Sequence, residues 1–131
     1  MNVSKTIDAP VDTVWSILID TDLWPQWGPS VMQVNYSQRW LEKGAAGHIK
    51  TAVGLWLPFK VTLFDPPNYW HWKVEGIPAT GHRLSPQSET SCQLSFEFPF
   101  MAFPYGIVCK RALMNIDQLT RKNVPSVNGS S

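Results

Sequence analysis

The chain has 131 residues, a length suited to one domain with a single hydrophobic core. Apolar residues make up 44% of it and aromatic residues 12%, a composition typical of a folded globule and not of a disordered chain. Eleven basic and ten acidic residues give a net charge of +1 without any basic cluster, which argues against nucleic-acid binding.

The N-terminus and the cysteines bear on compartment and cofactor. The N-terminus lacks the basic and apolar regions of a signal peptide, and no segment approaches the roughly 18 apolar residues of a spanning helix. We therefore expect a soluble, cytoplasmic protein without membrane insertion. Cys92 and Cys109 form no disulfide framework or zinc-binding pattern, so we expect them to be buried as small apolar side chains. We expect neither a metal nor another cofactor.

The first quarter of the chain predicts one strand and two short helices. Alternation over Asn2 to Ile7 is typical of a strand. Asp8 is the expected cap of a helix over Pro10 to Ile19, with the proline in its first turn. A second short helix is expected over Asp20 to Trp27. Its inward-facing side chains would be Leu23, Trp24 and Trp27.

The remainder predicts a meander of strands followed by one long helix. A period of two, punctuated by glycine and proline, marks six strands: Val31 to Trp40, Gly47 to Val53, Leu57 to Asp65, Tyr69 to Gly76, Ala79 to Ser85 and Thr90 to Phe98. Helical spacing returns from Tyr105 to Lys122. The domain is thus expected to span residues 1–122, and the tail 123–131 is expected to fray.

The alternation assigns an apolar face to the sheet, because every second side chain of a strand points to the same side. The residues assigned to this face include Phe59, Val61, Leu63, Trp70, Trp72, Leu94 and Phe96. A single helix is too narrow to cover a curved sheet of about seven strands. The remaining space holds either a ligand or a solid core of aromatic side chains, and both interpretations stay open.

The opening of the chain resembles a known superfamily. The run Ile7-Asp8-Ala9-Pro10-Val11-Asp12-Thr13-Val14-Trp15, followed by Asp20, Trp24 and Trp27, resembles the start of SRPBCC proteins, which include START, polyketide cyclase/dehydrase and Bet v 1-like members. The resemblance implies an α+β helix-grip fold, in which a curved antiparallel sheet wraps around a long C-terminal helix. It also implies an internal cavity for lipids, polyketides or other hydrophobic molecules.

Alternation along the strands assigns the three histidines to different faces of the sheet. His82 is expected to point inward beside Leu84, whereas His48 and His71 are expected on the outer face. An imidazole in an apolar cavity can act as general acid or base with a lowered pKa, or it can simply bond a backbone carbonyl. Tyr36 offers a phenol that can orient a ligand or move a proton.

Two functions from different classes follow, and a third stays open. The first is a carrier or sensor of a small hydrophobic molecule, held by the apolar face together with Tyr105, Cys109 and Leu113 of the last helix. The alternative is a polyketide cyclase or dehydratase that uses His82 and Tyr36. The third is an interaction protein whose apolar segment Phe98 to Tyr105 docks on a partner. The same segment also suits a lid over the pocket, the surface of a homodimer or a buried corner between the last strand and the last helix.

Overall fold

The computed structural model of the chain describes residues 2–28, 31–98 and 105–123, and these form one antiparallel sheet with helices packed on it. The strands are β1 (Asn2–Ile7), β2 (Val31–Asn35), β3 (Ala46–Thr51), β4 (Trp56–Asp65), β5 (Tyr69–Val74), β6 (Ile77–Ser88) and β7 (Ser91–Glu97). The helices are α1 (Val11–Ile19), the 3-10 helix η1 (Thr21–Leu23), α2 (Trp24–Trp27) and α3 (Tyr105–Asn123).

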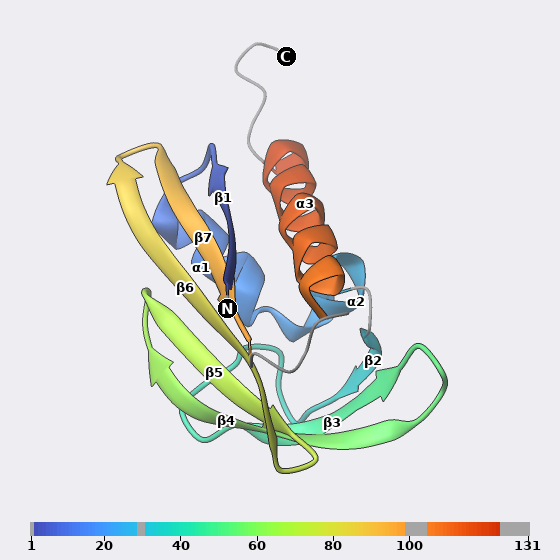
Figure 1. The fold of residues 1–131 in the computed structure, drawn as a ribbon. Helices are drawn as coiled ribbons and strands as arrows, with labels where there is room; N and C mark the ends of the chain where they lie inside the picture. Colours follow the sequence, from blue (N-terminus) through green and yellow to red (C-terminus); the bar gives the residue numbers. More distant parts are fainter. Residues whose placement is uncertain (1, 29–30, 99–104, 124–131) are drawn as a thin grey trace.

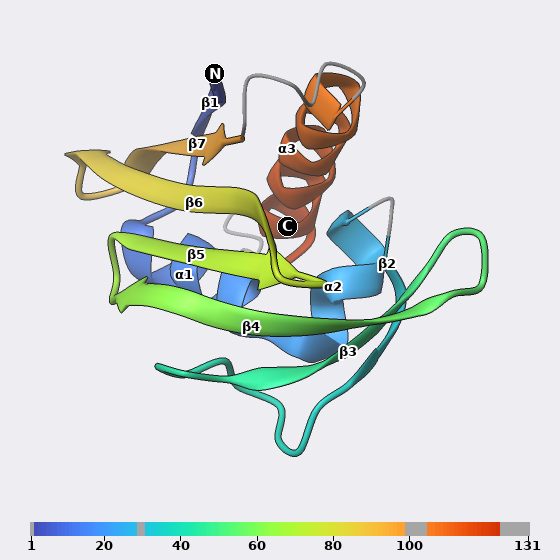
Figure 2. The same cartoon turned by 60° about the horizontal axis from the view of Figure 1, so that its bottom comes forward.

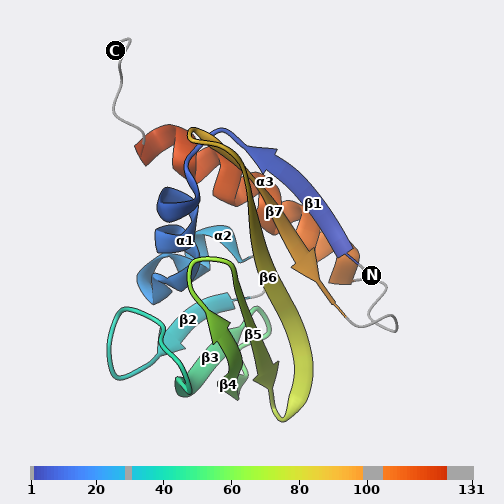
Figure 3. The same cartoon turned by 90° about the vertical axis from the view of Figure 1, so that its left-hand side faces the viewer.

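The sheet has the strand order β1-β7-β6-β5-β4-β3-β2, and every neighbouring pair is antiparallel. It curves strongly, and α1, α2 and α3 all lie on its concave side (Figure 1). Figure 3 shows α3 beside β1, which is one edge strand of the sheet, and β2 is the edge strand at the other end. The predicted α+β helix-grip fold, with two short helical segments after the first strand, is therefore confirmed.

Several boundaries differ from the sequence predictions. Pro10, and not Asp8, is the N-cap of α1, because the Pro10 carbonyl accepts the first helical N–H, that of Val14, at 3.2 Å. β2 ends at Asn35 instead of Trp40, because the chain leaves the sheet there and Trp40 instead bridges to Asp20. β6 extends beyond the predicted strand at both ends. α3 includes Asn123, and the rest of the predicted tail lies outside the described residues.

α3 closes the domain through one apolar stripe. It packs on β1, β7, α1 and α2. The side chains it buries include Cys109, Ala112, Leu113 and Ile116. Both cysteines are free and buried, as predicted, and burial raises the pKa of Cys109 to about 12 and that of Cys92 to about 11. Among the described helices, none combines the length and apolarity needed to cross a bilayer.

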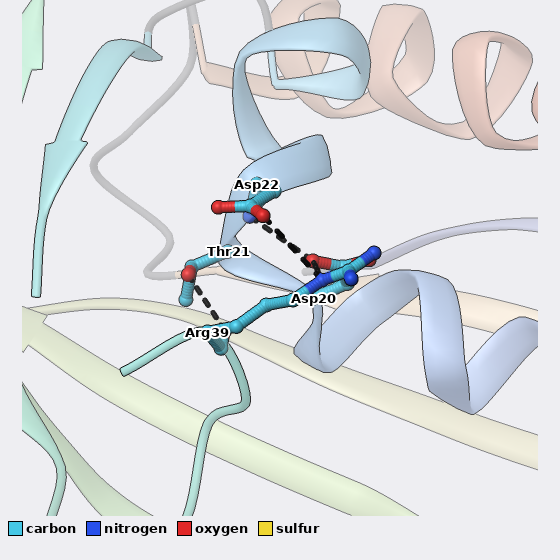
Figure 4. A network of polar contacts seen from close by, with 4 residues as sticks. All are labelled: Asp20, Thr21, Asp22 and Arg39. Carbon is cyan, nitrogen blue, oxygen red and sulfur yellow. Dashed lines mark hydrogen bonds and ion pairs between the residues drawn. The ribbon is translucent and has the colours of Figure 1, made fainter. Parts of the chain in front are cut away.

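An ion pair between the buried Asp20 and the more exposed Arg39 ties the connection between β2 and β3 to the end of α1 (Figure 4). Arg39 donates from Nε to Asp20 Oδ1 at 2.9 Å and from Nη2 to Asp20 Oδ2 at 2.7 Å. Thr21 Oγ1 donates to the Arg39 carbonyl at 2.7 Å. The Asp20 carboxylate also accepts the Asp22 N–H, so it fixes the turn that leads into α2. This network sets where α2 meets the sheet.

Asp20→Ala should lower the free energy of unfolding by about 2–3 kcal/mol, because it removes a buried carboxylate that accepts three hydrogen bonds. Urea denaturation measures the change. The control is Glu97→Ala, which breaks the more exposed pair with Arg83 and should cost less than about 1 kcal/mol. Equal losses in the two variants would contradict the structural role of Asp20.

Candidate functional site

Six aromatic side chains and one histidine meet on the concave face of the sheet. We call this set the aromatic cluster, and it consists of Trp24, Trp27, Phe59, Trp70, Trp72, His82 and Phe96. All seven side chains are buried. The cluster joins α2 to β4, β5, β6 and β7, and none of its members carries a full charge at neutral pH.

Alternation along the strands and one glycine explain why the sheet residues of the cluster point to the inner face. Trp70 and Trp72 occupy alternate positions of β5, and His82 and Phe96 lie opposite each other on β6 and β7. Gly47 pairs with Phe59, and a Cβ at Gly47 would lie 3.0 Å from the phenyl ring and 2.6 Å from the Asn35 carbonyl. The absence of a side chain at Gly47 therefore leaves room for Phe59 on the inner face.

α2 supplies the two rings that lie over the sheet. Trp24 stacks with Trp70 at 5.7 Å between centroids, and its indole N–H donates to the Leu18 carbonyl at 2.9 Å. Asn115 of α3 donates to the Trp27 carbonyl at 3.2 Å, which joins the two helices. Aromatic side chains thus fill part of the inner face, in agreement with one of the two sequence interpretations.

Leu63 is not part of the inner face, and its predicted place in the site is wrong. The side chain is 57% exposed. The pairing of β4 with β5 shifts between Val61 and Leu63, which inserts one extra residue and reverses the alternation. Phe64 turns inward instead and contacts Trp15 of α1, with 5.5 Å between the ring centroids. Phe59 and Val61, which precede the shift, are buried as predicted.

His82 lies at the centre of the cluster. Its ring stacks on that of Trp70 with 3.8 Å between the ring centroids, and it meets the ring of Phe96 edge-on with 4.9 Å between centroids. Nδ1 lies 3.3 Å from the Trp70 carbonyl, so Nδ1 carries the proton and donates it, which leaves Nε2 as a bare acceptor. Burial lowers the pKa of His82 to about 3. The inward orientation predicted for this residue is confirmed, and the imidazole is neutral near pH 7.

The four indoles of the cluster differ in hydrogen bonding. Trp24 donates to the Leu18 carbonyl, and Trp72 donates to Thr80 Oγ1 at 2.8 Å. The indole N–H groups of Trp27 and Trp70 are buried, and neither has a hydrogen-bond partner among the described residues. Most buried donors in native proteins are paired, so these two nitrogens are exceptional.

Tyr36 lies at the rim of the cluster and not beside His82. Its ring contacts that of Phe59 with 6.0 Å between the ring centroids. Its hydroxyl accepts a hydrogen bond from Gln38 Nε2 at 3.2 Å. Phe59 and Trp72 lie along the chain of ring contacts that leads from Tyr36 to His82. The structure does not bring the two predicted acid/base residues together.

A pocket of about 300 Å³ opens between η1, α2 and β2. Its lining residues are Thr21, Asp22, Pro25, Met32, Gln33, Val34, Tyr36 and Gln38. Tyr36 belongs to the pocket wall and also touches Phe59, so the pocket adjoins the aromatic cluster. Apart from Tyr36, the sequence prediction missed these residues, because the pocket forms only when the α1–α2 turn folds against an edge strand.

The other predicted site residues fall in several environments. Leu94, Cys109 and Leu113 are buried in the core. Tyr105 begins α3, but its side chain lies outside the described residues, as do residues 99–104 of the predicted lid or dimer segment. His48 is exposed, and His71 is half-buried with Nδ1 3.0 Å from Thr62 Oγ1. Within the described residues, no three metal-ligating side chains are grouped to hold an ion.

Residues 1–115 match the family model described as polyketide cyclase / dehydrase and lipid transport. The chain belongs to this family. The match confirms the SRPBCC resemblance of the opening motif. No curated protein matches the chain in sequence.

Solved structures with the same fold are remote in sequence. Protein MLL2253 from Mesorhizobium loti has a TM-score of 0.69 at 16% identity, covering 94% of this chain and 97% of its own. Protein NE0264 from Nitrosomonas europaea has a TM-score of 0.67 at 16% identity, with 93% and 94% covered. StfQ, a di-domain ARO/CYC from the steffimycin biosynthetic pathway, has a TM-score of 0.73 at 11% identity, with 96% and 46% covered. At these identities the likeness shows the fold alone.

The burial of His82 predicts how the stability of this family member depends on pH. Unfolding returns the pKa of His82 from about 3 to about 6.5, so the unfolded chain binds an extra proton between these pH values. The free energy of unfolding should therefore fall as the pH drops through this window, by an amount on the order of 4 kcal/mol from this residue.

His82→Gln keeps a side-chain N–H for the Trp70 carbonyl and removes the titration. Urea denaturation at several pH values should show a shallower acid-side loss of stability for the variant than for the native protein. All other ionisable groups are the same in the two proteins, so the difference between the two curves isolates His82. Parallel curves would contradict the burial of an uncharged imidazole.

Proposed function

We propose that the protein binds a small hydrophobic molecule against the concave face of its sheet, as a carrier or sensor. The observation that carries this proposal is the pocket of about 300 Å³ that shares Tyr36 with the aromatic cluster. A pocket of this size, at the lower end of the range for ligand sites, suits a molecule of one or two rings. Its wall combines the side chains of Val34 and Tyr36 with polar groups, among them those of Gln33 and Gln38. The match to a family described as polyketide cyclase / dehydrase and lipid transport supports the same class of ligand.

The chemistry of the cluster also favours an uncharged ligand. Its aromatic rings offer large apolar surface at low cost in conformational entropy. The pocket wall includes the carboxylate of Asp22, which is largely exposed. Its Oδ2 forms an ion pair with Arg39 Nε at 3.4 Å. A charged group moved into the cluster would lose its hydration without gaining a counter-ion. Apolar, uncharged molecules therefore suit the site best.

Catalysis is the second candidate, and His82 is the residue that favours it. Nε2 of a neutral imidazole is a base, and the cyclase or dehydratase reaction needs a group that removes a proton from carbon. A pKa of about 3 makes this base weak, and Tyr36 is not placed to assist it. Binding without chemistry is therefore the better supported of the two functions.

Val34→Gln should weaken the binding of an apolar dye such as Nile red several-fold, because it places an amide in the half-buried wall of the pocket. Dye fluorescence titration measures the effect. The matched control is Leu63→Gln, since Leu63 is an aliphatic side chain exposed on the outer face of the sheet. A dye that binds the native protein and both variants equally would place binding elsewhere.

The catalytic candidate has its own test. A linear poly-β-ketone incubated with the native protein is analysed by mass spectrometry for loss of water. A dehydratase that uses His82 should lose turnover in His82→Gln and still bind the substrate. A carrier should return the compound unchanged from both proteins, and this is the outcome we expect.

A further inference from the structure

The tip of the β3–β4 hairpin exposes apolar side chains that take no part in the core. Val53 is 80% exposed, Leu55 60% and Trp56 46%. Figure 1 and Figure 2 both show the hairpin extending away from the rest of the sheet. A Cβ added at Gly54 would meet nothing within 4 Å apart from its chain neighbours, so the tip stands in open space. Large apolar side chains gathered in such a place indicate an interaction surface.

The backbone alone closes this turn. The Thr51 N–H donates to the Leu55 carbonyl at 2.8 Å, and the Gly54 N–H donates to the Thr51 carbonyl at 2.9 Å. Gly54 has a φ of +87°, which a glycine adopts without strain. The exposed apolar side chains are therefore not needed to hold the tip together.

Three lysines lie beside the tip on the outer face of the sheet. Lys50 is the cross-strand partner of Trp56, and Lys60 is the partner of Lys73. Partners in register point to the same side of a sheet, and Trp56 and Lys60 occupy alternate positions of β4. Both pairs thus share one side. It is the outer side, because Phe59, next to Lys60, is buried on the inner one.

The charge of these lysines is not neutralised within the protein. In the part of the chain that the structure describes, no carboxylate lies within 4 Å of the ammonium group of Lys50, Lys60 or Lys73. Glu75, in the neighbouring β5–β6 turn, is exposed and forms no ion pair with them. Like charges directly opposite each other destabilise a sheet, and Lys60 faces Lys73 in this way. An anionic partner would remove that repulsion.

We propose that this surface docks the protein on an anionic lipid bilayer. We call it the hairpin surface, and it consists of Lys50, Val53, Leu55, Trp56, Lys60 and Lys73. The apolar tip lies at the boundary of headgroups and acyl chains, and the ammonium groups contact the lipid phosphates. Such peripheral binding needs no spanning segment. It goes beyond the proposed binding of a small molecule in the pocket and does not depend on it.

Shape and charge favour a bilayer over a protein partner. Docking of the hairpin surface on that of a second copy would bring lysines against lysines. A stable protein interface covers about 800 Å² on each partner, more than a projecting tip of three apolar side chains provides. Lipids, in contrast, adapt their packing to a small inserted tip, and their phosphates complement the lysines.

Co-sedimentation with vesicles tests the proposal. The probes are vesicles of pure phosphatidylcholine and vesicles of equal parts phosphatidylcholine and phosphatidylglycerol. The native protein should bind the anionic vesicles more tightly, and added salt should release it because salt screens the attraction. Lys60→Gln should lower the partition constant about fivefold, the effect of one lysine near an anionic surface. Leu55→Gln should lower it about tenfold, because an apolar side chain no longer leaves water.

Each variant has a matched control. Lys110→Gln removes the same charge from an exposed position of α3. Leu63→Gln removes an exposed aliphatic side chain from the other end of β4. Both controls should bind the anionic vesicles as the native protein does. Losses equal to those of Lys60→Gln and Leu55→Gln would show that binding follows overall charge and apolarity, and would overturn the proposal.

The native protein also reports the orientation without any variant. A spin-labelled lipid in anionic bicelles should attenuate the amide NMR signals of Val53, Leu55 and Trp56 more than those of Glu89 and Thr90, which lie in the β6–β7 turn. Equal attenuation of the two turns would contradict docking through the hairpin surface.

Failure of the native protein to bind anionic vesicles would also overturn the inference. Dye binding in the pocket is measured without lipid, so the proposed function is judged separately from this result. Dimerisation of the lipid-free protein that Trp56→Gln abolishes, measured by analytical ultracentrifugation, would in that case assign the hairpin surface to a second copy.

Discussion

The stack of Trp24, Trp70 and His82 is the interaction on which the inner face depends. Trp70 lies nearly parallel to both partners, at 6° to Trp24 and 14° to His82. The stack joins α2 to the central strands β5 and β6, and the Trp24 indole is fixed in turn by the end of α1. The packing of these rings places an imidazole where only its neutral form is stable. The concave face is consequently aromatic, uncharged and furnished with a few polar atoms.

The position of α2 depends on an interaction far from these rings. Asp20 and Arg39, which are 19 residues apart, hold the β2–β3 connection against the turn between α1 and α2. Figure 2 shows α2 lying over the curved sheet close to β2, with the β3–β4 hairpin extending to one side. The pocket beside Tyr36 lies between these same elements. One ion pair thus bears on the placement of the cluster and on the shape of the opening next to it.

Much of the fold follows from local patterns, and the exceptions have physical causes. A period of two was sufficient to orient Trp70, Trp72, His82 and Phe96, because regular pairing preserves alternation along a strand. It failed at Leu63, because a bulge in the register leaves no mark in the amino-acid pattern. The same limit applies to the indoles. Whether a buried tryptophan finds an acceptor depends on backbone atoms distant in sequence, so nothing in the sequence separates Trp70 from Trp72.

The central claim is that a small apolar molecule binds in the pocket that shares Tyr36 with the aromatic cluster. The indole N–H protons of the seven tryptophans give one NMR signal each, and tryptophan-to-phenylalanine variants assign them. Addition of an apolar dye such as Nile red tests this claim most directly. We predict that the indole signals of Trp24 and Trp72, which contact Phe59 next to Tyr36, move as the dye binds, while the signal of the exposed Trp56 stays in place. Saturating dye that leaves both the Trp24 and the Trp72 signals unchanged would contradict the claim.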